Sequence, residues 1–208
     1  YLVATATMDM FRMLGALPDI RFSGTDASGW YIPEAKEAME NGSILYAGKY
    51  SEPDYERIVS EGCGLAIENT MILHSPEVKE KLESLGIPVM VERSSYEEHP
   101  LGRLEWIRLY GLLYGKEQEA DAFYEEQLKK IEPIMEKEDT GRTVAFFYIT
   151  ANGAVNVRKP NDYIAQMIGL AGGTYVLNDR LSAEENALST MNMQMEDFYA
   201  AAKDADIL

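Results

Sequence analysis

The residues with the greatest chemical potential in this sequence are arginines and aromatic residues that follow strand-like segments. Arg93 comes just after an apolar run that ends at Val91, and Arg158 follows a second β-like run. A guanidinium group forms paired hydrogen bonds with carboxylate and similar anionic oxygens, and aromatic rings offer flat apolar surface. This combination predicts recognition of a small molecule by a binding protein.

The full set of candidate ligand-binding residues follows from where ligands lie in α/β proteins. Ligands in such sheets bind beyond the carboxyl ends of the strands. The residues just after the expected strands are Thr7, Met8, Trp30, Tyr31, Asn69, Thr70, Arg93, Ser95, Tyr96, Tyr148, Asn152, Arg158 and Tyr163. Ordinary packing or a place in a solvated loop is the alternative for each of them.

The sequence offers little for catalysis or direct metal binding. His74 and His99 are the only histidines, and Cys63 is the only cysteine. Zinc and manganese sites need several such ligands together, so no metal site is predicted. His99 precedes Pro100 where a helix is expected to begin, which favours a capping or loop role. Haem ligation by one histidine or tyrosine is a minor alternative. No phosphate loop or nucleophile motif is present, and no catalytic residue is predicted.

The charge of the chain argues against nucleic acid as a partner. The 208 residues carry a formal net charge of −16, and no run of basic residues is longer than a pair such as Arg158-Lys159. A nucleic-acid binder needs a basic face that neutralises phosphates. No apolar stretch approaches the roughly 20 residues of a membrane span. Because the chain begins at Tyr1 rather than Met, we expect a processed or trimmed product.

The first hundred residues alternate between strand and helix patterns. The expected strands cover residues 2–5, 20–23, 44–47, 65–67 and 87–91. The expected helices cover residues 8–17, 33–39, 54–61 and 76–86. Strands separated by helices with short connections are typical of a parallel sheet covered on both faces.

The rest of the chain begins with a helical segment and then returns to an α/β pattern. Residues 101–137 are helical except near Gly115, and a helix over 117–137 would be about 30 Å long. The later pattern predicts strands over 143–149, 154–157 and 205–208, and helices over 162–170 and 196–202. Asn152-Gly153 is a hairpin signal. The fold class is thus α/β, with two Rossmann-like lobes joined by a long connecting helix.

This reading divides the chain into three parts. Residues 1–100 form an N-terminal α/β lobe, residues 101–137 form a connecting helical segment, and residues 138–208 form a C-terminal α/β lobe. The last expected strand breaks off at the end of the chain, and a lobe of roughly 70 residues is small for a stable domain. We therefore expect the second lobe to be incomplete at its C-terminus.

A repeated pattern carries a resemblance to a known family. Residues 54–59 lead to the strand at 65–67, and residues 195–199 lead to the strand at 205–208. The glutamates Glu56 and Glu196 stand at nearly the same distance before the two strands. This resembles the "Glu, short helix, strand" repeat of the extracellular solute-binding proteins of ABC importers, in the class that captures iron–siderophore, haem or cobalamin complexes.

Two further stretches strengthen the resemblance. Residues 97–107, which include His99-Pro100-Leu101-Gly102-Arg103, resemble the segment that leads from the first lobe toward the connecting helix in a Gram-positive branch of the family. Residues 158–164 and the Gly172-Gly173 turn resemble the hairpin, helix and turn of the second lobe. The family strand usually follows Pro-Asp, whereas this chain has Cys63-Gly64 and Asp204-Ala205.

The resemblance implies a function. It implies a monomeric, extracytoplasmic binding component, either a cell-surface lipoprotein or a periplasmic protein, without an intrinsic cofactor. The ligand would be a ferric siderophore, with haem or cobalamin as second choices, bound in an interlobe cleft. Glu56 and Glu196 would meet arginines of the membrane permease. An enzyme or a sensor domain on the same two-lobe scaffold is the alternative.

Overall fold

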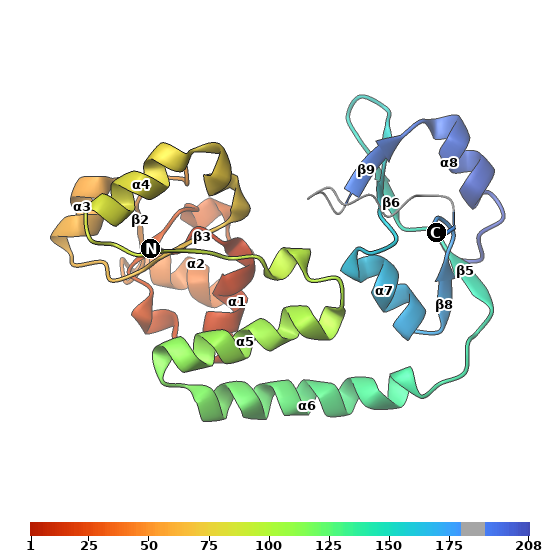
Figure 1. The fold of residues 1–208 in the computed structure, drawn as a ribbon, viewed down its shortest axis with the longest axis horizontal. Coiled ribbons are helices and arrows are strands. Elements are labelled where there is room, and N and C mark those ends of the chain that lie inside the picture. The colour runs from red at the N-terminus through yellow and green to blue at the C-terminus, as the bar shows by residue number, and fades with distance from the viewer. Residues whose placement is uncertain (180–189) are drawn as a thin grey trace. The chain divides into compact units, whose positions relative to one another are not determined.

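A computed structural model describes residues 1–179 and 190–208, and the chain divides into two compact units (Figure 1). The first unit contains residues 1–95 and 107–123, and the second contains residues 96–106 and 124–208. The two long helices, α5 (Pro100–Tyr114) and α6 (Glu117–Met135), therefore contribute residues to both units. In the part of the chain that the structure describes, no helix has both the length and the apolar character of a membrane span.

The long helix expected near the middle of the chain is confirmed. α6 has 19 residues, which corresponds to about 28 Å at the usual rise. Gly115 separates it from α5 and has a φ of 63°, in the left-handed region where a side chain is disfavoured. The break that the sequence predicts at this glycine is thus a real change of backbone direction.

A parallel sheet lies at the centre of the first unit. Its strands are β1 (Phe22–Ser23), β2 (Leu45–Tyr46), β3 (Ala66–Glu68) and β4 (Val89–Val91). β1 pairs with β2 and β3 pairs with β4, both in parallel. Leu2 forms parallel bridges to Ser23 and to Ile67, so it joins the two pairs. The order across the sheet is β2, β1, the Leu2 segment, β3 and β4, as expected for a parallel α/β unit.

Helices alternate with these strands. They are α1 (Thr5–Met13), α2 (Pro33–Glu40), α3 (Tyr55–Ser60) and α4 (Pro76–Ser84), with 3₁₀ turns η1 (Leu17–Asp19), η2 (Ala27–Gly29), η3 (Thr70–His74) and η4 (Ser94–Tyr96). All four expected helices are present. The strand expected over residues 2–5 is wrong beyond Leu2, because Thr7 donates its backbone N–H to the carbonyl of Ala4 and α1 begins at Thr5.

The core of the first unit lies on both sides of β3. Ala66 belongs to a buried cluster with Ile58 of α3 and with Val78 and Leu82 of α4. Ile67 points to the opposite side by the alternation of a strand, and it is also buried. The sheet is therefore covered on both faces at this strand, which explains why residues 65–67 form an uninterrupted apolar run.

The described residues of the second unit form two sheets. β5 (Arg142–Val144) pairs in parallel with β8 (Gly173–Tyr175), and an antiparallel sheet has the order β6 (Phe147–Ile149), β7 (Val155–Arg158), β9 (Thr190–Met193). Its helices are α7 (Tyr163–Leu170) and α8 (Met195–Ala202). Phe198 of α8 packs against Phe147, with ring centroids 4.4 Å apart, and this contact joins α8 to the antiparallel sheet.

The continuous strand expected over 143–149 is wrong. The structure divides it into β5 and β6, which belong to different sheets. The backbone N–H of Ala145 bonds to the carbonyl of Ile207 between the two strands, so the chain changes partners there. The hairpin expected at Asn152-Gly153 is confirmed, with Ile149 opposite Val155. The expected last strand is reduced to one parallel bridge between Val144 and Ile207.

Gly48, which follows β2, occupies a backbone position where any side chain should destabilise the first unit. Its φ is 84°, and a Cβ added there would lie 2.1 Å from the carbonyl oxygen of Glu52. Gly48→Ala is expected to lower the free energy of unfolding by about 2–3 kcal/mol, because the left-handed strain and the clash add together.

Gly62→Ala is the matched control. Gly62 also has a positive φ, 73°, but an added Cβ would meet nothing within 4 Å. The control should cost only about 1 kcal/mol, the usual cost of left-handed strain. Equal losses in the two variants, measured by urea unfolding, would show that the contact with Glu52 has no energetic weight.

Candidate functional site

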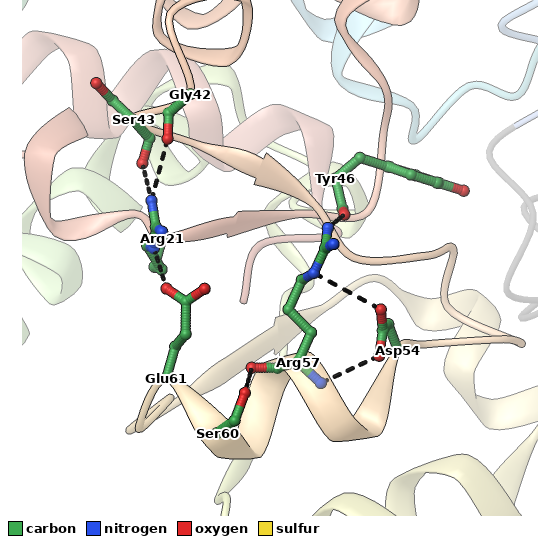
Figure 2. A network of polar contacts seen from close by, with 8 residues as sticks. All are labelled: Arg21, Gly42, Ser43, Tyr46, Asp54, Arg57, Ser60 and Glu61. Atoms are coloured by element: carbon green, nitrogen blue, oxygen red, sulfur yellow. Dashed lines mark hydrogen bonds and ion pairs between the residues drawn. The ribbon is translucent and has the colours of Figure 1, made fainter.

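The carboxylate of Glu56 is exposed in the first turn of α3, a helix of six residues. A helix this short depends on contacts at its ends, because its own backbone hydrogen bonds are few. Figure 2 shows these contacts. Asp54 accepts the backbone N–H of Arg57 at 3.1 Å, and the Arg57 guanidinium donates to the carbonyl of Tyr46 at 3.2 Å. The start of α3 is thereby attached to the end of β2.

Arg21 holds the other end of α3 (Figure 2). Its guanidinium donates to the carboxylate of Glu61, which follows the helix, and to the carbonyl oxygens of Gly42 and Ser43 at 3.1 and 3.0 Å. Arg21 precedes β1, and the two carbonyls precede β2. Both ends of α3 are therefore attached to the β1–β2 pair, and these contacts fix the position of the helix that carries Glu56.

Glu196 has a similar setting in the second unit. It is exposed in the first turn of α8, and buried Phe198 anchors the same helix. α3 leads to β3, and α8 leads to Ile207, which bridges β5 in parallel. The two glutamates thus stand at exposed helix starts ahead of parallel pairings, one in each unit. Their meeting with a permease stays a prediction.

Three candidate ligand residues of the first unit are buried. Thr7 and Met8 have no exposed surface, and the Thr7 hydroxyl lies 3.1 Å from the hydroxyl of Tyr110. Trp30 is 7% exposed, and its indole N–H donates to the Ser23 hydroxyl at 3.1 Å. These side chains already have partners within the unit, so the structure favours the packing alternative for all three.

The other candidates of the first unit lie closer to solvent. Tyr31 is 97% exposed, whereas Asn69 is half-buried and caps η3 by accepting the backbone N–H of Met71 at 2.9 Å. Thr70 is also half-buried, and Arg93 and Ser95 are exposed after β4. The structure therefore leaves Tyr31, Arg93 and Ser95 as the accessible members at this edge.

A buried carboxylate lies at the end of β3. Glu68 has no exposed surface, and neither of its oxygens has a hydrogen-bond partner among the described residues. Burial raises the pKa of Glu68 to about 8, because a charged carboxylate is poorly solvated in the protein interior. The nearby Glu92 differs, since one of its oxygens accepts the backbone N–H of Ser94 at 2.6 Å. Nothing in the sequence pattern of residues 65–70 distinguishes Glu68 from an exposed glutamate.

Residues 96–106, which include the first half of α5, belong to the second unit and contain the candidate Tyr96. Tyr96 is exposed, and Trp106 donates its indole N–H to Glu97 at 2.9 Å. The Arg103 guanidinium lies 3.9 Å from the ring centroid of Tyr163, a cation–π contact that orients this half-buried tyrosine. One face of the Tyr163 ring is therefore already in contact with Arg103, a residue of the same unit.

Two other candidates lie on one face of the antiparallel sheet. Tyr148 of β6 is 58% exposed and stands opposite Asn156 of β7. Arg158 lies two residues further along β7, on the same face, and its guanidinium is 5.9 Å from the ring centroid of Phe146. Asn152 is exposed in the hairpin loop. Tyr148 and Arg158 are thus brought together. Asn156 lies between them on the same face, although it was not among the predicted ligand-binding residues.

Arg158 has an internal partner. Its guanidinium lies 3.6 Å from a carboxylate oxygen of Asp162, whose side chain is 1% exposed. Asp162 also accepts the backbone N–H of Ile164 at 2.9 Å and so caps α7. The hydroxyl of Tyr175 donates to the carbonyl of Arg158 at 2.9 Å. The position of Arg158 is therefore fixed, and its charge is partly balanced within the unit.

The histidines follow the capping interpretation where the structure tests it. His99 accepts the backbone N–H of Leu101 at 3.2 Å, at the start of α5. His74 ends η3 and is exposed. Among the described residues, no three His, Cys, Asp or Glu side chains are grouped as metal ligands would be. Met191 and Met193 pack against the core of the second unit.

A pocket of about 400 Å³ lies elsewhere in the first unit. Its lining includes Arg21 and Leu65, which precede β1 and β3, together with Cys63 and Tyr114. Arg21 and Leu65 lie at the amino-terminal ends of these two parallel strands, and Tyr114 is the last residue of α5. The pocket is therefore on the opposite edge from the one at which α/β proteins bind their ligands.

A family model and a sequence relative both match most of this chain. A family model described as periplasmic binding protein matches residues 3–189. An uncharacterized lipoprotein of Methanocaldococcus jannaschii is 27% identical over 186 residues, which are 86% of this chain and 42% of that protein. The chain therefore spans less than half the length of this relative.

Solved structures show the same fold. The periplasmic haem-binding protein of Vibrio cholerae gives a TM-score of 0.74 at 18% identity, over 96% of this chain and 71% of that one. A siderophore-binding protein of Vibrio cholerae, bound to Fe³⁺-Desferal, gives a TM-score of 0.73 at 12% identity, over 99% of this chain and 75% of that one. At these identities the likeness concerns the fold.

Proposed function

The chain belongs to the periplasmic binding protein family, and on that basis we propose that it captures a metal chelate for an ABC importer. It acts as a monomer that binds the chelate and delivers it to a membrane permease. The observation that carries the proposal is the family match over residues 3–189, and the two exposed glutamates in matching settings support the delivery step. The family match favours a binding protein over the enzyme and sensor alternatives.

The proposed ligand is a ferric siderophore, with haem or cobalamin as second choices. Structural neighbours bind Fe³⁺-Desferal, haem and vitamin B12, which supports this range of bulky chelates. The proposed location is extracytoplasmic, as a cell-surface lipoprotein or a periplasmic protein. The lipoprotein of Methanocaldococcus jannaschii supports the anchored form.

A titration tests this proposal. The protein is mixed with haemin, cyanocobalamin and a panel of ferric siderophores, and binding is followed by absorbance and by native mass spectrometry. We expect one-to-one binding of at least one chelate with a Kd of micromolar or below. If none of these chelates binds, capture of a metal chelate is rejected.

Arg93 and Arg158 are proposed ligand contacts. Arg93→Ala should weaken binding of a chelate with anionic oxygens by about 1–3 kcal/mol, if its guanidinium makes a charge-assisted hydrogen bond. Arg158→Ala should have an effect near the lower end of this range, because Asp162 already balances part of the charge of Arg158. Isothermal titration calorimetry measures both effects. Unchanged affinity in both variants would remove the arginines from the site.

A further inference from the structure

The face of the β6–β7–β9 sheet that points away from the core of the second unit carries a row of polar and aromatic side chains. The strand register places Tyr148, Asn156 and Asn192 side by side across the three strands. The residues that alternate with them, including Phe147, Val157 and Met191, pack into the core of the second unit. We call the face with Tyr148, Asn156, Asn192, Arg158 and Phe146 the amide face.

The two asparagines form a pair with unused hydrogen-bonding capacity. Asn156 Nδ2 donates to Asn192 Oδ1 at 2.8 Å across the strands. This bond fixes both amide groups. Among the described residues, Asn156 Oδ1 and Asn192 Nδ2 have no hydrogen-bond partner. The pair therefore offers one acceptor and one donor, which complement the N–H and C=O groups of ligand amides.

The surroundings of the pair favour a neutral polar group on a flat ligand. Tyr148 is 58% exposed and Phe146 is 44% exposed, so aromatic surface adjoins the amides. The cation on the same face, Arg158, is paired with the buried carboxylate of Asp162. A ligand carboxylate would thus find a charge that is already balanced, whereas an amide would find both a donor and an acceptor.

We propose that the amide face binds the amide-bearing rim of the chelate. The inference rests on the proposed function and narrows its ligand class. Two kinds of chelate share the required chemistry: corrinoids, which carry carboxamide side chains, and linear hydroxamate siderophores, which carry amide groups between their chelating units. Haem, which carries carboxylates on its rim, lacks it.

The test compares ligands on the protein and two variants at Asn192. Cyanocobalamin, ferric desferrioxamine B and haemin are titrated by fluorescence quenching and calorimetry. At least one of the first two should bind more tightly than haemin, and the one that binds identifies the source of the amide. Asn192→Asp keeps the acceptor for Asn156 Nδ2 but replaces the outward donor, and should weaken amide-chelate binding by about tenfold or more. Asn192→Leu removes the donor without adding charge and should have a comparable effect.

A control variant in the first unit shows whether the loss of affinity is specific to Asn192. Asn41 in the first unit accepts hydrogen bonds from the backbone N–H and the hydroxyl of Ser43 through its Oδ1. Asn41→Asp is therefore the same chemical change at a distant exposed site, and should leave affinity unchanged. Preferential binding of haemin, or unchanged affinity in both Asn192 variants, would overturn the role of the amide face while leaving chelate capture intact. Failure of all three ligands to bind, with binding of another ferric siderophore, would also overturn the role of the amide face. Failure of the whole siderophore panel as well would overturn the proposed function.

Discussion

Glu68→Gln is expected to raise the free energy of unfolding by about 5 kcal/mol at pH 9, and by much less at pH 5. The carboxyl of Glu68 is fully buried and has no hydrogen-bond partner among the residues that the structure describes, and its pKa rises to about 8 from the ordinary value of 4.5. The folded protein therefore holds a proton that the unfolded chain has already released. Each unit of pKa difference corresponds to about 1.4 kcal/mol, which gives the expected size of the effect.

The sign follows from proton binding. Below pH 4.5 both states are protonated, and Glu68 causes no pH dependence. Between pH 4.5 and 8 only the unfolded state loses its proton, so stability falls as pH rises. Above pH 8 the cost is fully present and constant. Glutamine is neutral throughout and should flatten this part of the curve.

Urea unfolding followed by circular dichroism at pH 5, 7 and 9 measures the effect. Glu80→Gln, at an exposed position of α4, is the control and should change the pH profile little. A Glu68→Gln variant whose stability runs parallel to that of the parent protein across this range would show that Glu68 is ionised and solvated in the folded state.

Reversal of charge at both Glu56 and Glu196 is expected to reduce uptake by at least about tenfold. One exposed ion pair contributes only about 0–1 kcal/mol, but two that engage together also fix orientation. Lysine at both positions would face the arginines of the permease, and like charges at an interface cost several kcal/mol. Ligand affinity should stay unchanged, because neither residue belongs to the proposed ligand contacts.

The experiment measures transport in a reconstituted importer, together with chelate affinity in solution. Glu80→Lys combined with Asp204→Lys is the matched control, because it makes the same change of charge at one exposed position in each unit. Parallel loss of uptake in the control would indicate a general charge effect. Normal transport by the Glu56 and Glu196 variant would leave these glutamates with helix-dipole compensation as their only role.

Local patterns predicted the elements of the fold well, because turn signals and apolar periodicity act over short distances. Gly115 and the Asn152-Gly153 turn both mark real changes of chain direction. The division of residues 143–149 into two strands was not predictable, since it depends on Ile207, more than fifty residues away. A β-prone run carries no information about which partner each half will take.

The candidate site was harder to predict than the fold. Position after a strand selected Thr7 and Trp30, which pack inward because they meet Tyr110 and Ser23 in the folded unit. The same rule does not select Asn156 and Asn192 of the proposed amide face, because they lie within strands. The alternation of apolar and polar residues in Val155–Arg158 does contain the signal, because a half-covered strand exposes every second side chain.

The division of the chain into its two units also has a consequence for how the protein is made. The first unit includes residues 107–123, and its buried contact between Thr7 and Tyr110 joins positions 103 residues apart. A nascent chain that ends before α5 therefore lacks part of the core of its first unit. Contacts so distant in sequence slow folding, because a long loop must close before they form. The core of the first unit can thus be completed only after residues 107–123 have been made, when residues 96–106 of the second unit already exist.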